Sequence, residues 1–419
     1  MGRLALLMTV GTGTGDNKEK RIESLAHGIL HSIYHNKHDY IVFFGSTESK
    51  ATIEKVKELA EKENKLPEYE FVLINKIALF NELFEKIKKK IIELKEKGYD
   101  ILIDYTSGTK TMSATAAIAG ALYKTRLCYI DGERKKGVVI PGTEYVVHQN
   151  LFKYYNEEIF REIQIFFNNY SFNAAKKLLE NVIAEDEKRE YWKQMIEAYD
   201  LWDKFKHEES FAILRCIKGE KLNMNKEFLG RLVHEKNNYR KYIYLLVDLL
   251  NNAKRRIEET KYDDAVARLY RTIELIAQIE LDKLDLIDKE KLRKDKTFVL
   301  DPEKLENMLD KKTMEKLIKY REEKDLTEGK IKIGLHKSYD LLSSIGHDLG
   351  KKFEEDKQLF DLLSKRNKSI LAHGVESVEK KTAEKLLKKV QNFAEETFPE
   401  VKKLMKKAEF PKLEITEIK

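Results

Sequence analysis

The fold of this chain is indicated by residues 102–117, which read LIDYTSGTKTMSATAA. Apolar and β-favouring residues lead into Thr-Ser-Gly-Thr-Lys-Thr, and a run of small residues that suits a helix follows. A strand, a glycine loop and a helix in this order are typical of a loop that holds a phosphate. Glycine lets backbone N–H groups approach an anion, and the N-terminus of the helix adds a favourable dipole. The loop matches no common nucleotide-binding motif, so its ligand must be inferred from the rest of the chain.

The same alternation of strands and helices extends over the first 150 residues. Short runs of apolar, β-branched or aromatic residues are separated by segments with apolar residues three or four positions apart. Strands that are apolar throughout predict a parallel sheet covered on both faces, so we expect a doubly wound, Rossmann-like α/β domain. Residues 137–149 are expected to form a terminal hairpin that turns at Pro141-Gly142. The predicted strands are residues 4–10, 40–46, 69–75, 99–107 and 126–131.

Beyond about residue 150 the strand signal stops, and long helical patterns with aromatic and aliphatic stripes replace it. Examples are residues 160–183, 239–259 and 262–281. We therefore predict an all-α second half. The predicted division is an α/β domain at residues 1–150, a helical connector at 151–230 and a helical domain at 231–419.

The composition excludes several classes of protein. With 419 residues, 42% hydrophobic and 36% charged, the chain is neither disordered nor a membrane protein, and two or three domains are expected. Cys128 and Cys216 have no metal-ligand spacing, which favours a reducing compartment. The apolar N-terminus resembles a buried strand rather than a signal peptide, so we expect a cytoplasmic protein. A net charge of +7 permits an anionic partner, and abundant Lys and Glu are typical of proteins that work at high temperature.

Two glycine loops are expected to meet at one point of the predicted sheet. A doubly wound sheet binds ligands at the carboxyl ends of its strands, where the strand order reverses. If the order is 3-2-1-4-5, the reversal lies between the first strand, followed by VGTGTGDN at 10–17, and the fourth, followed by YTSGTKTMS at 105–113. We expect these loops to form an anion site, with Lys110 as a point charge and FGSTES at 44–49 as a third contributor.

The two loops leave the nature of the anion open. The first reads G-x-G-x-G rather than G-x-G-x-x-G, and no acidic residue closes the second strand to hold a ribose. The second contains Lys110 but lacks the G-x-x-x-x-G-K-[ST] pattern, which argues against ATP hydrolysis by a P-loop. The alternative is that the glycines only form tight turns and that Thr and Ser cap helices. Two loops converging at one point is more than turn geometry requires.

A candidate catalytic motif lies near the C-terminus, in LLSKRNKSILAHGVES at 362–377. Arg366 and His373 are seven residues apart, about two helical turns, so both are expected to project from nearly the same face. Arginine holds phosphate bidentately and histidine moves protons near neutral pH. Together they could cleave RNA without a metal, because the ribose 2′-OH attacks its own phosphate while histidine transfers a proton and arginine stabilises the charge. Alternatively, His373 beside Gly374 only caps a helix end.

Other polar clusters have simpler interpretations. A row of histidines four residues apart near the N-terminus lacks the glutamate of a metalloprotease motif, and His347-Asp348 lacks further ligands. No metal site is therefore predicted. Tyr270, Arg271 and Glu274 share one helical face, and the spacing of Arg271 and Glu274 predicts a structural ion pair.

The two halves together resemble a known family. The Rossmann-like half, with TVGTGTG after its first strand and DYTSGTKTMSA after its fourth, resembles the CARF domain, the sensor of CRISPR-associated effectors. The segment RNKSILAHG looks like the motif of HEPN ribonucleases, R-x(4–6)-H with a polar residue after the arginine. The order and length resemble the CARF–HEPN ribonucleases of type III CRISPR systems, over residues 1 to about 150 and about 230 to 400.

This resemblance implies a ligand, a reaction and a partner. The CARF half would bind cyclic oligoadenylate (tetra- or hexa-adenylate) across a homodimer interface, and some CARF domains also degrade this ligand slowly. Two HEPN domains would form one metal-independent site that cuts single-stranded RNA without a cofactor, with Arg366 and His373 catalytic and Asn367 supporting them. Ligand binding would favour the active arrangement of that dimer. The implied ligand-binding residues are Gly11, Thr12, Gly13, Thr14, Thr47, Ser107, Gly108, Thr109, Lys110 and Thr111.

Two other functions are compatible with the sequence. The first is a non-enzymatic sensor whose helical half binds nucleic acid or a partner, although no short basic helix-turn-helix is present. The second is a dinucleotide-dependent enzyme, against which the missing ribose-binding acid argues. A ligand-activated ribonuclease is the function that accounts for both motifs.

Overall fold

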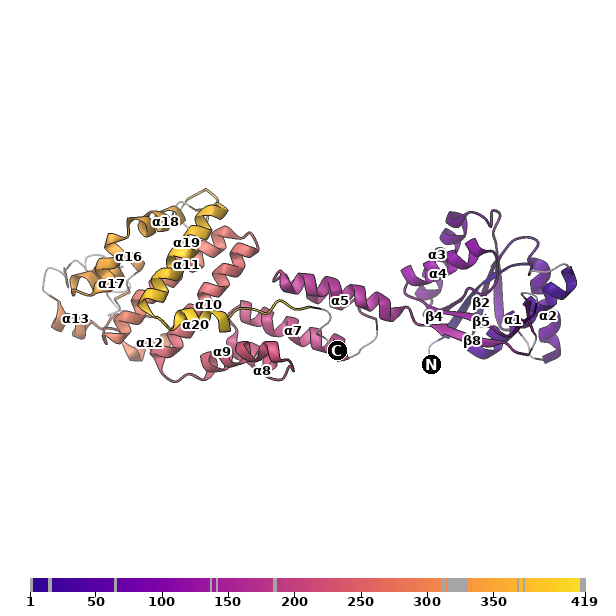
Figure 1. Ribbon diagram of the computed structural model, residues 1–419, viewed down its shortest axis with the longest axis horizontal. Helices are drawn as coiled ribbons and strands as arrows, with labels where there is room; N and C mark the ends of the chain where they lie inside the picture. Colours follow the sequence, from indigo (N-terminus) through magenta and orange to yellow (C-terminus); the bar gives the residue numbers. More distant parts are fainter. Residues whose placement is uncertain are drawn as a thin grey trace. The chain divides into compact units, whose positions relative to one another are not determined.

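Figure 1 shows the computed structural model, in which the chain divides into two units, Met1–Glu158 and Ile159–Lys419. The boundary lies within α5 (Phe152–Asn168), so this helix begins in the first unit and ends in the second. The domain limits predicted at residues 150 and 230 stay predictions. The structure describes residues 3–13, 17–63, 66–135, 138–140, 142–183, 187–309, 314–315, 331–332, 334–367, 369–371 and 374–414.

The first unit is built on a six-stranded sheet with the order β3-β2-β1-β4-β5-β8. The first five strands along the chain are parallel, as predicted, and β8 adds an antiparallel edge. The doubly wound α/β fold and the predicted reversal between the first and fourth strands are confirmed. The elements are β1 Arg3–Val10, α1 Lys18–Asn36, β2 Tyr40–Gly45, α2 Lys50–Glu63, β3 Glu68–Leu73, α3 Phe80–Glu96, β4 Tyr99–Asp104, α4 Lys110–Leu122, β5 Arg126–Asp131 and β8 Tyr145–Gln149.

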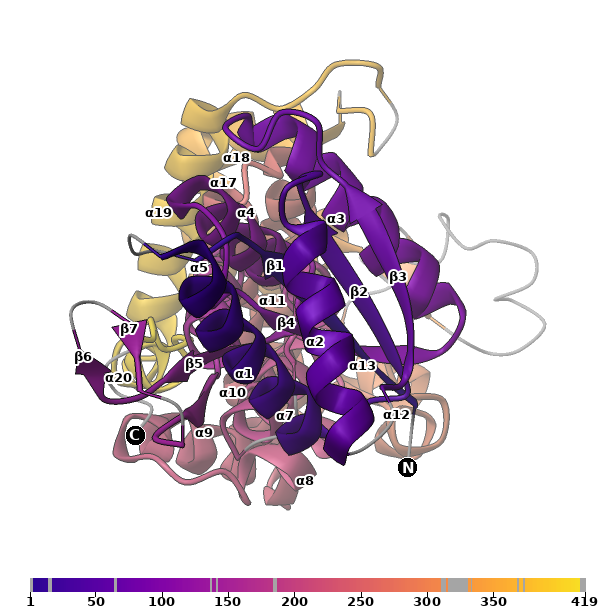
Figure 2. The same ribbon diagram turned by 90° about the vertical axis from the view of Figure 1, so that its right-hand side faces the viewer.

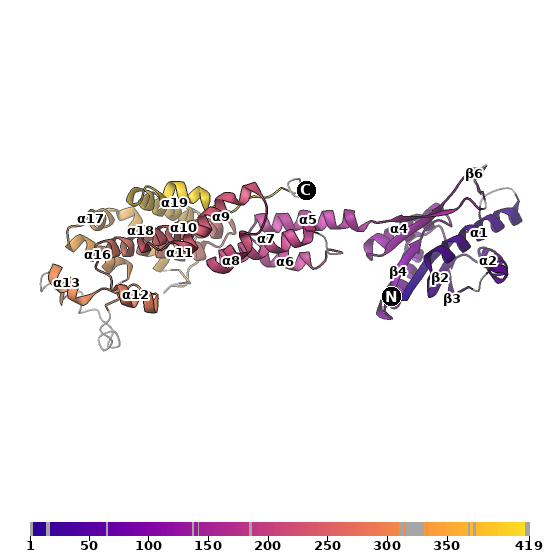
Figure 3. The same ribbon diagram turned by 90° about the horizontal axis from the view of Figure 1, so that it is seen from below.

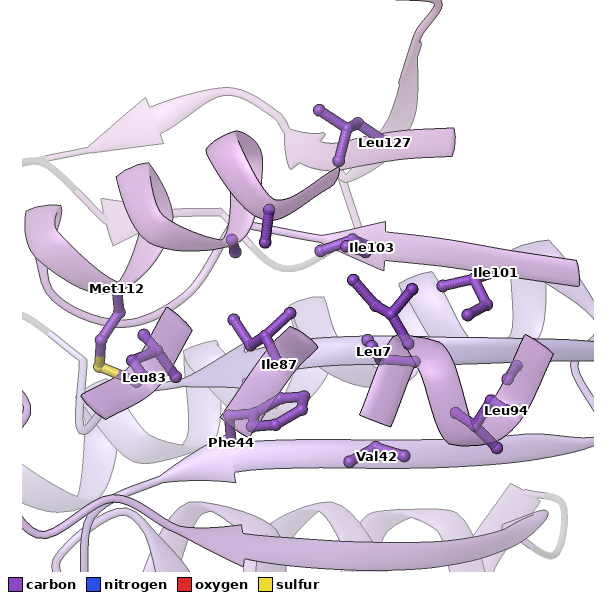
Figure 4. Packing of buried hydrophobic residues seen from close by; sticks show 14 of the residues in the cluster. Leu7, Val42, Phe44, Leu83, Ile87, Leu94, Ile101, Ile103, Met112 and Leu127 are labelled. Carbon is purple, nitrogen blue, oxygen red and sulfur yellow. The ribbon is translucent and has the colours of Figure 1, made fainter. Parts of the chain in front are cut away.

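Helices cover both faces of this sheet, which is why its central strands are apolar throughout. Alternate residues of β1 point to opposite faces, with Leu7 in the core under α3 and α4, and Leu6 in the core under α1 and α2. Figure 4 shows Leu7 with Ile87 of α3 and Met112 of α4. Figure 2 shows α1 and α2 side by side over the other face.

The end of the first unit differs from the predicted hairpin. Strand β7 (Val138–Val139) pairs with β6 (Arg134–Lys135), whereas β8 pairs with β5 along five residues. The hairpin expected over 137–149 is therefore wrong, and Pro141 lies outside the described residues. The physical reason is that β5 would otherwise be an open edge, and β8 satisfies its backbone groups over a longer register than β7 offers.

The second unit is helical in all its long elements. Helices α10 and α11 pack against each other, and α19 packs on both (Figure 3). Leu269, Ile273 and Ile276 form the apolar stripe that buries α11. The elements after α5 are α6 Phe172–Leu179, α7 Glu187–Asp203, α8 His207–Leu214, η1 Glu220–Leu222, α9 Asn223–His234, α10 Asn238–Glu258, α11 Tyr262–Lys283, α12 Lys289–Asp295, α13 Pro302–Met308, α16 Leu335–Ser344, α17 Asp348–Glu355, α18 Lys357–Asn367, α19 Lys380–Thr397 and α20 Val401–Lys407.

The segment after α20 returns to the end of α5. Phe410 is 4% exposed and lies among aromatic rings, with ring centroids 4.8 Å from Tyr199 and 5.0 Å from Trp202. The Asn168 side chain exchanges two hydrogen bonds with the backbone of Leu413, at 2.9 and 3.0 Å. Side-chain amides thus provide hydrogen-bond partners for the backbone of a segment without regular structure, and this segment becomes part of the helical core.

A buried histidine predicts that the stability of the first unit depends on pH. Burial lowers the pKa of His38 from 6.5 to about 4 and outweighs the opposite effect of Asp39. Because the folded pKa is depressed, the stabilising contribution is complete above pH 6.5 and is lost as the pH falls towards 4. We expect the Tm of this unit to fall over that range, and to fall less in His38→Gln. The control is His148→Gln, which replaces an exposed histidine. If the Tm of His38→Gln falls as much as that of the wild type over this pH range, the prediction is contradicted.

Candidate functional site

The two predicted loops lie next to each other at the carboxyl ends of β1 and β4, which are neighbours in the sheet. A cavity of about 400 Å³ opens between them and extends along α1. Its position is the one where doubly wound sheets bind ligands. Its walls include Met8, Gly11, Thr12, Gly13, Arg21, Ser24, Leu25, Gly28, Ile29, Ser46, Ile77, Asp104, Thr106, Ser107, Gly108, Thr109, Ile130 and Glu144.

The loops touch through their backbones at two glycines. A Cβ atom on Gly11 would lie 2.9 Å from the Cα of Gly108, closer than such atoms pack. The Gly11 N–H donates to Ser107 Oγ at 2.9 Å, and the Thr9 hydroxyl donates to the Ser107 carbonyl. Gly108 also has a φ of +107°, a conformation that side chains disfavour. Glycine is therefore required on both sides of this contact.

Asp104 supports the second loop from below. Its side chain is buried with the residue only 1% exposed, and Oδ1 accepts from the Thr106 backbone N–H at 2.8 Å. The Ser32 hydroxyl of α1 donates to Oδ2 at 2.5 Å. Burial raises the pKa of Asp104, although these hydrogen bonds act in the opposite direction. The Thr106 hydroxyl in turn accepts from Ile130 N–H at 2.7 Å, so the loop is fixed to β5 as well.

The structure gathers part of the predicted ligand-binding set around the cavity. Thr109 caps α4 by accepting from Met112 N–H at 3.3 Å, and Lys110 and Thr111 follow in the first turn. Thr47 is exposed in the turn before α2, whereas its neighbour Ser46 faces the cavity. Thr14 lies outside the described residues. The predicted residues that line the cavity are Gly11, Thr12, Gly13, Ser107, Gly108 and Thr109.

One wall of the cavity was missed from the sequence. Arg21, Ser24, Leu25 and Gly28 of α1 line it, and they follow the i, i+3, i+4, i+7 spacing of one helical face. This helix begins just beyond the first glycine loop, and that position in the chain was the signal that could have revealed them. Arg21 brings a fixed positive charge to the cavity, whose other charged wall residues, among those described, are Asp104 and Glu144.

The arginine of the second motif lies in the last turn of α18, over the ring of Tyr270. Its Cζ atom is 4.5 Å from the ring centroid. Helix α18 ends at Asn367, so the expectation that Arg366 and His373 project from two turns of one helix is wrong. Beyond α18, Ser369 forms an isolated parallel bridge with Glu376. His373 lies outside the described residues, as does the side chain of Asn367.

Helix α11 provides one contact of this motif, through Tyr270. The predicted ion pair is confirmed, with Arg271 Nη1 2.9 Å from Glu274 Oε2. Tyr270, which shares that face in the sequence pattern, contacts Arg366 instead. Exposed apolar side chains lie within the motif and just after it, with Ile370 64%, Leu371 54% and Val375 89% exposed.

Neither a metal site nor a membrane span is found in the described part of the chain. No group of three or more His, Cys, Asp or Glu residues there is arranged to hold a metal ion. Over the same residues, no helix combines the length and apolarity needed to cross a membrane.

The contact between the two glycines predicts a difference between two alanine variants. Gly11→Ala must push the loops apart, because its Cβ meets backbone, and we expect a destabilisation of about 1–3 kcal/mol. Gly28→Ala, on another wall of the cavity, has no atom within 4 Å of its Cβ and should be neutral or slightly stabilising in a helix. Thermal unfolding of the first unit measures both. Equal Tm values for the two variants would contradict the contact.

Comparisons with known proteins place three family models along the chain. Residues 48–143 match a CRISPR-associated protein family (Cas_APE2256), residues 155–244 the Csm6 6H domain, and residues 234–397 the Csm6 HEPN domain. The first match contains β3, β4 and β5 of the sheet and the second glycine loop, and the last contains Arg366 and Tyr270. A search of curated proteins finds no match.

Solved structures share the fold at low sequence identity. Csm6 of Enterococcus italicus, solved with cyclic hexa-2′-fluoro-hexa-dAMP, has a TM-score of 0.64 and 14% identity over 97% of this chain and 98% of its own. Can2 of Sulfobacillus thermosulfidooxidans, solved with cyclic tetra-adenylate, has a TM-score of 0.25 and 8% identity over 48% of this chain and 67% of its own, too low to carry an argument. Because the family matches follow one another in the order of a sensor and a HEPN domain, the chain belongs to the CARF–HEPN effectors of type III CRISPR systems.

Proposed function

We propose that this protein is an endoribonuclease that cuts single-stranded RNA when cyclic oligoadenylate binds its CARF domain. The observation that carries the proposal is the presence, in one chain, of the two-loop cavity and of an arginine motif in a Csm6-type HEPN domain. A HEPN domain of this type implies a ribonuclease. The E. italicus relative, which has the same fold, was solved with a cyclic oligonucleotide.

The chemistry of the cavity supports an oligoadenylate as the ligand. Backbone N–H groups of the glycine loops, the hydroxyls of Thr12 and Thr109 and the charge of Arg21 suit phosphate groups. Leu25 and Ile29 of α1 offer apolar surface that suits the faces of adenine bases. Lys110 and Thr111 follow at the N-terminus of α4, where they could contact a ligand that extends beyond the cavity.

The size of the cavity supports a homodimer. About 400 Å³ suits a drug-sized ligand, which is closer to one nucleotide than to a ring of four or six. Such a ring would need the loops of two chains. On α4, which begins at the site, Ile118 is 44% and Leu122 65% exposed, and these apolar side chains suit a contact with a second CARF domain.

The reaction proposed for the HEPN domain is attack of the ribose 2′-OH on its own phosphate. Arg366 would stabilise the negative charge of the transition state, His373 would transfer the proton, and Asn367 would support them. The exposed apolar side chains at 370, 371 and 375 support pairing of two HEPN domains beside Arg366. Ligand binding raises activity only to the extent that the ligand binds the active arrangement more tightly.

Cleavage of fluorescent single-stranded RNA in EDTA tests the proposed function. We expect cleavage to be switched on by cyclic tetra-adenylate or cyclic hexa-adenylate and to fall about 100-fold or more in Arg366→Ala and His373→Ala. Lys365→Ala removes an exposed charge next to Arg366 on α18 and should cut like the wild type. Cleavage by both motif variants at the wild-type rate would exclude the HEPN mechanism.

Binding of cyclic tetra-adenylate and cyclic hexa-adenylate tests the role of α1 in the sensor. Arg21→Gln removes a charge from the cavity wall, and we expect the affinity for the activating ring to fall about tenfold or more. Lys18→Gln, an exposed cation in the first turn of the same helix, is the matched control. Calorimetric titration of each variant measures the change, and equal affinities would exclude this wall from the site.

A further inference from the structure

The contact between Arg366 and Tyr270 joins the two helices that support the HEPN motif. Arg366 lies in the last turn of α18, and Tyr270 lies in the middle of α11, half-buried. The guanidinium carbon sits 4.5 Å from the centroid of the ring, within the distance at which an aromatic face attracts a cation. Arg271 and Glu274 on α11 form an ion pair with each other, and Tyr270 of the same group contacts Arg366 of the motif.

A ring can orient an arginine without neutralising it. A carboxylate partner would compete directly with a phosphate for the guanidinium, because both are anions that bind it bidentately. An aromatic face attracts the cation through its quadrupole and does not itself neutralise the charge of the guanidinium. Burial raises the pKa of the Tyr270 phenol, although Arg366 acts against this shift, so the ring stays neutral at physiological pH.

Helix α11 holds both ends of the motif segment. Asp263, seven residues and about two turns before Tyr270, accepts a hydrogen bond from Val378 N–H through Oδ2 at 3.1 Å. Arg366 itself accepts a hydrogen bond at its carbonyl from Ser369 N–H at 2.9 Å, where the chain leaves α18. Because α11 is buried along most of its length, it is a rigid base from which to place a reacting group.

We propose that Tyr270 is a positioning residue for RNA cleavage, whose ring holds the guanidinium of Arg366 where the phosphate of the transition state will lie. The proposal rests on the ribonuclease function proposed above. It does not require the phenol hydroxyl, because the attraction comes from the face of the ring. Removal of the hydroxyl alone and removal of the whole ring are therefore predicted to have different effects on cleavage.

Single-turnover cleavage with saturating activator and RNA tests this proposal. Tyr270→Phe keeps the ring and should retain the wild-type rate. Tyr270→Leu and Tyr270→Met remove the ring, and we expect the rate to fall between about 10- and 100-fold, as a displaced catalytic group does. Affinity for RNA should change less than the rate, because Arg366 acts on the transition state. Tyr262→Leu, a half-buried tyrosine in the first turn of the same helix, is the matched control and should cut like the wild type.

A spectroscopic readout separates positioning from a general loss of structure and does not depend on activity. A proton above an aromatic ring is shielded, so the Nε–H signal of Arg366, assigned with Arg366→Lys, should lie upfield in the wild type and in Tyr270→Phe. It should move downfield in Tyr270→Leu and Tyr270→Met. The Tm of each variant shows whether the helical unit is folded, and either ring-deleted variant that folds serves the test.

Three results would overturn the proposal. The first is cleavage at the wild-type rate by a folded ring-deleted variant. The second is an Arg366 Nε–H chemical shift that is the same with and without the ring. The third is a faster rate without the ring, which would mean that Tyr270 restrains Arg366. Absence of cleavage by the wild type with either cyclic adenylate is a different result, because it removes the ribonuclease function itself and the proposal with it.

Discussion

The first unit depends on the close approach of two backbones, Gly11 after β1 and Gly108 after β4. No side chain fits between them, since a Cβ on Gly11 would lie 2.9 Å from the neighbouring Cα. The approach lets Ser107 bridge the two loops and leaves their N–H groups and hydroxyls around one cavity. Asp104, buried beneath the loop and bonded to Ser32 and Thr106, fastens this arrangement to α1 and β5.

In the helical unit, a segment outside the helices is also held in place, but by side chains of a neighbouring helix. Its motif begins where α18 ends, and the described residues between α18 and α19 belong to no helix. Helix α11 supplies the missing support through Asp263 at Val378 and Tyr270 at Arg366. At the far end of the unit, Asn168 and the aromatic rings around Phe410 hold the segment after α20. In both places side chains of neighbouring helices hold a segment that has no regular structure.

Much of the sensor could be predicted because its features are local. Apolar strands separated by helices predicted the parallel sheet, and the glycines and hydroxyls after the first and fourth strands predicted loops that meet. Arg21 was missed because a helix face that lines a cavity has the same spacing as a face that meets water. The predicted hairpin was wrong because β8 pairs with β5. The sequence around residues 137–149 does not show that β5 offers an unpaired edge to which β8 can add.

By itself the sequence determined the two-part architecture, the reversal of strand order, the two glycine loops and the Arg366 motif, because periodicity and turn chemistry act over a few neighbouring residues. Only the tertiary structure decided which helix lines the cavity, where α18 ends, and that Tyr270 meets Arg366. Tyr270 and Arg366 lie 96 positions apart in the chain. Packing alone brings such residues together, and no local pattern records the partner that a side chain will find.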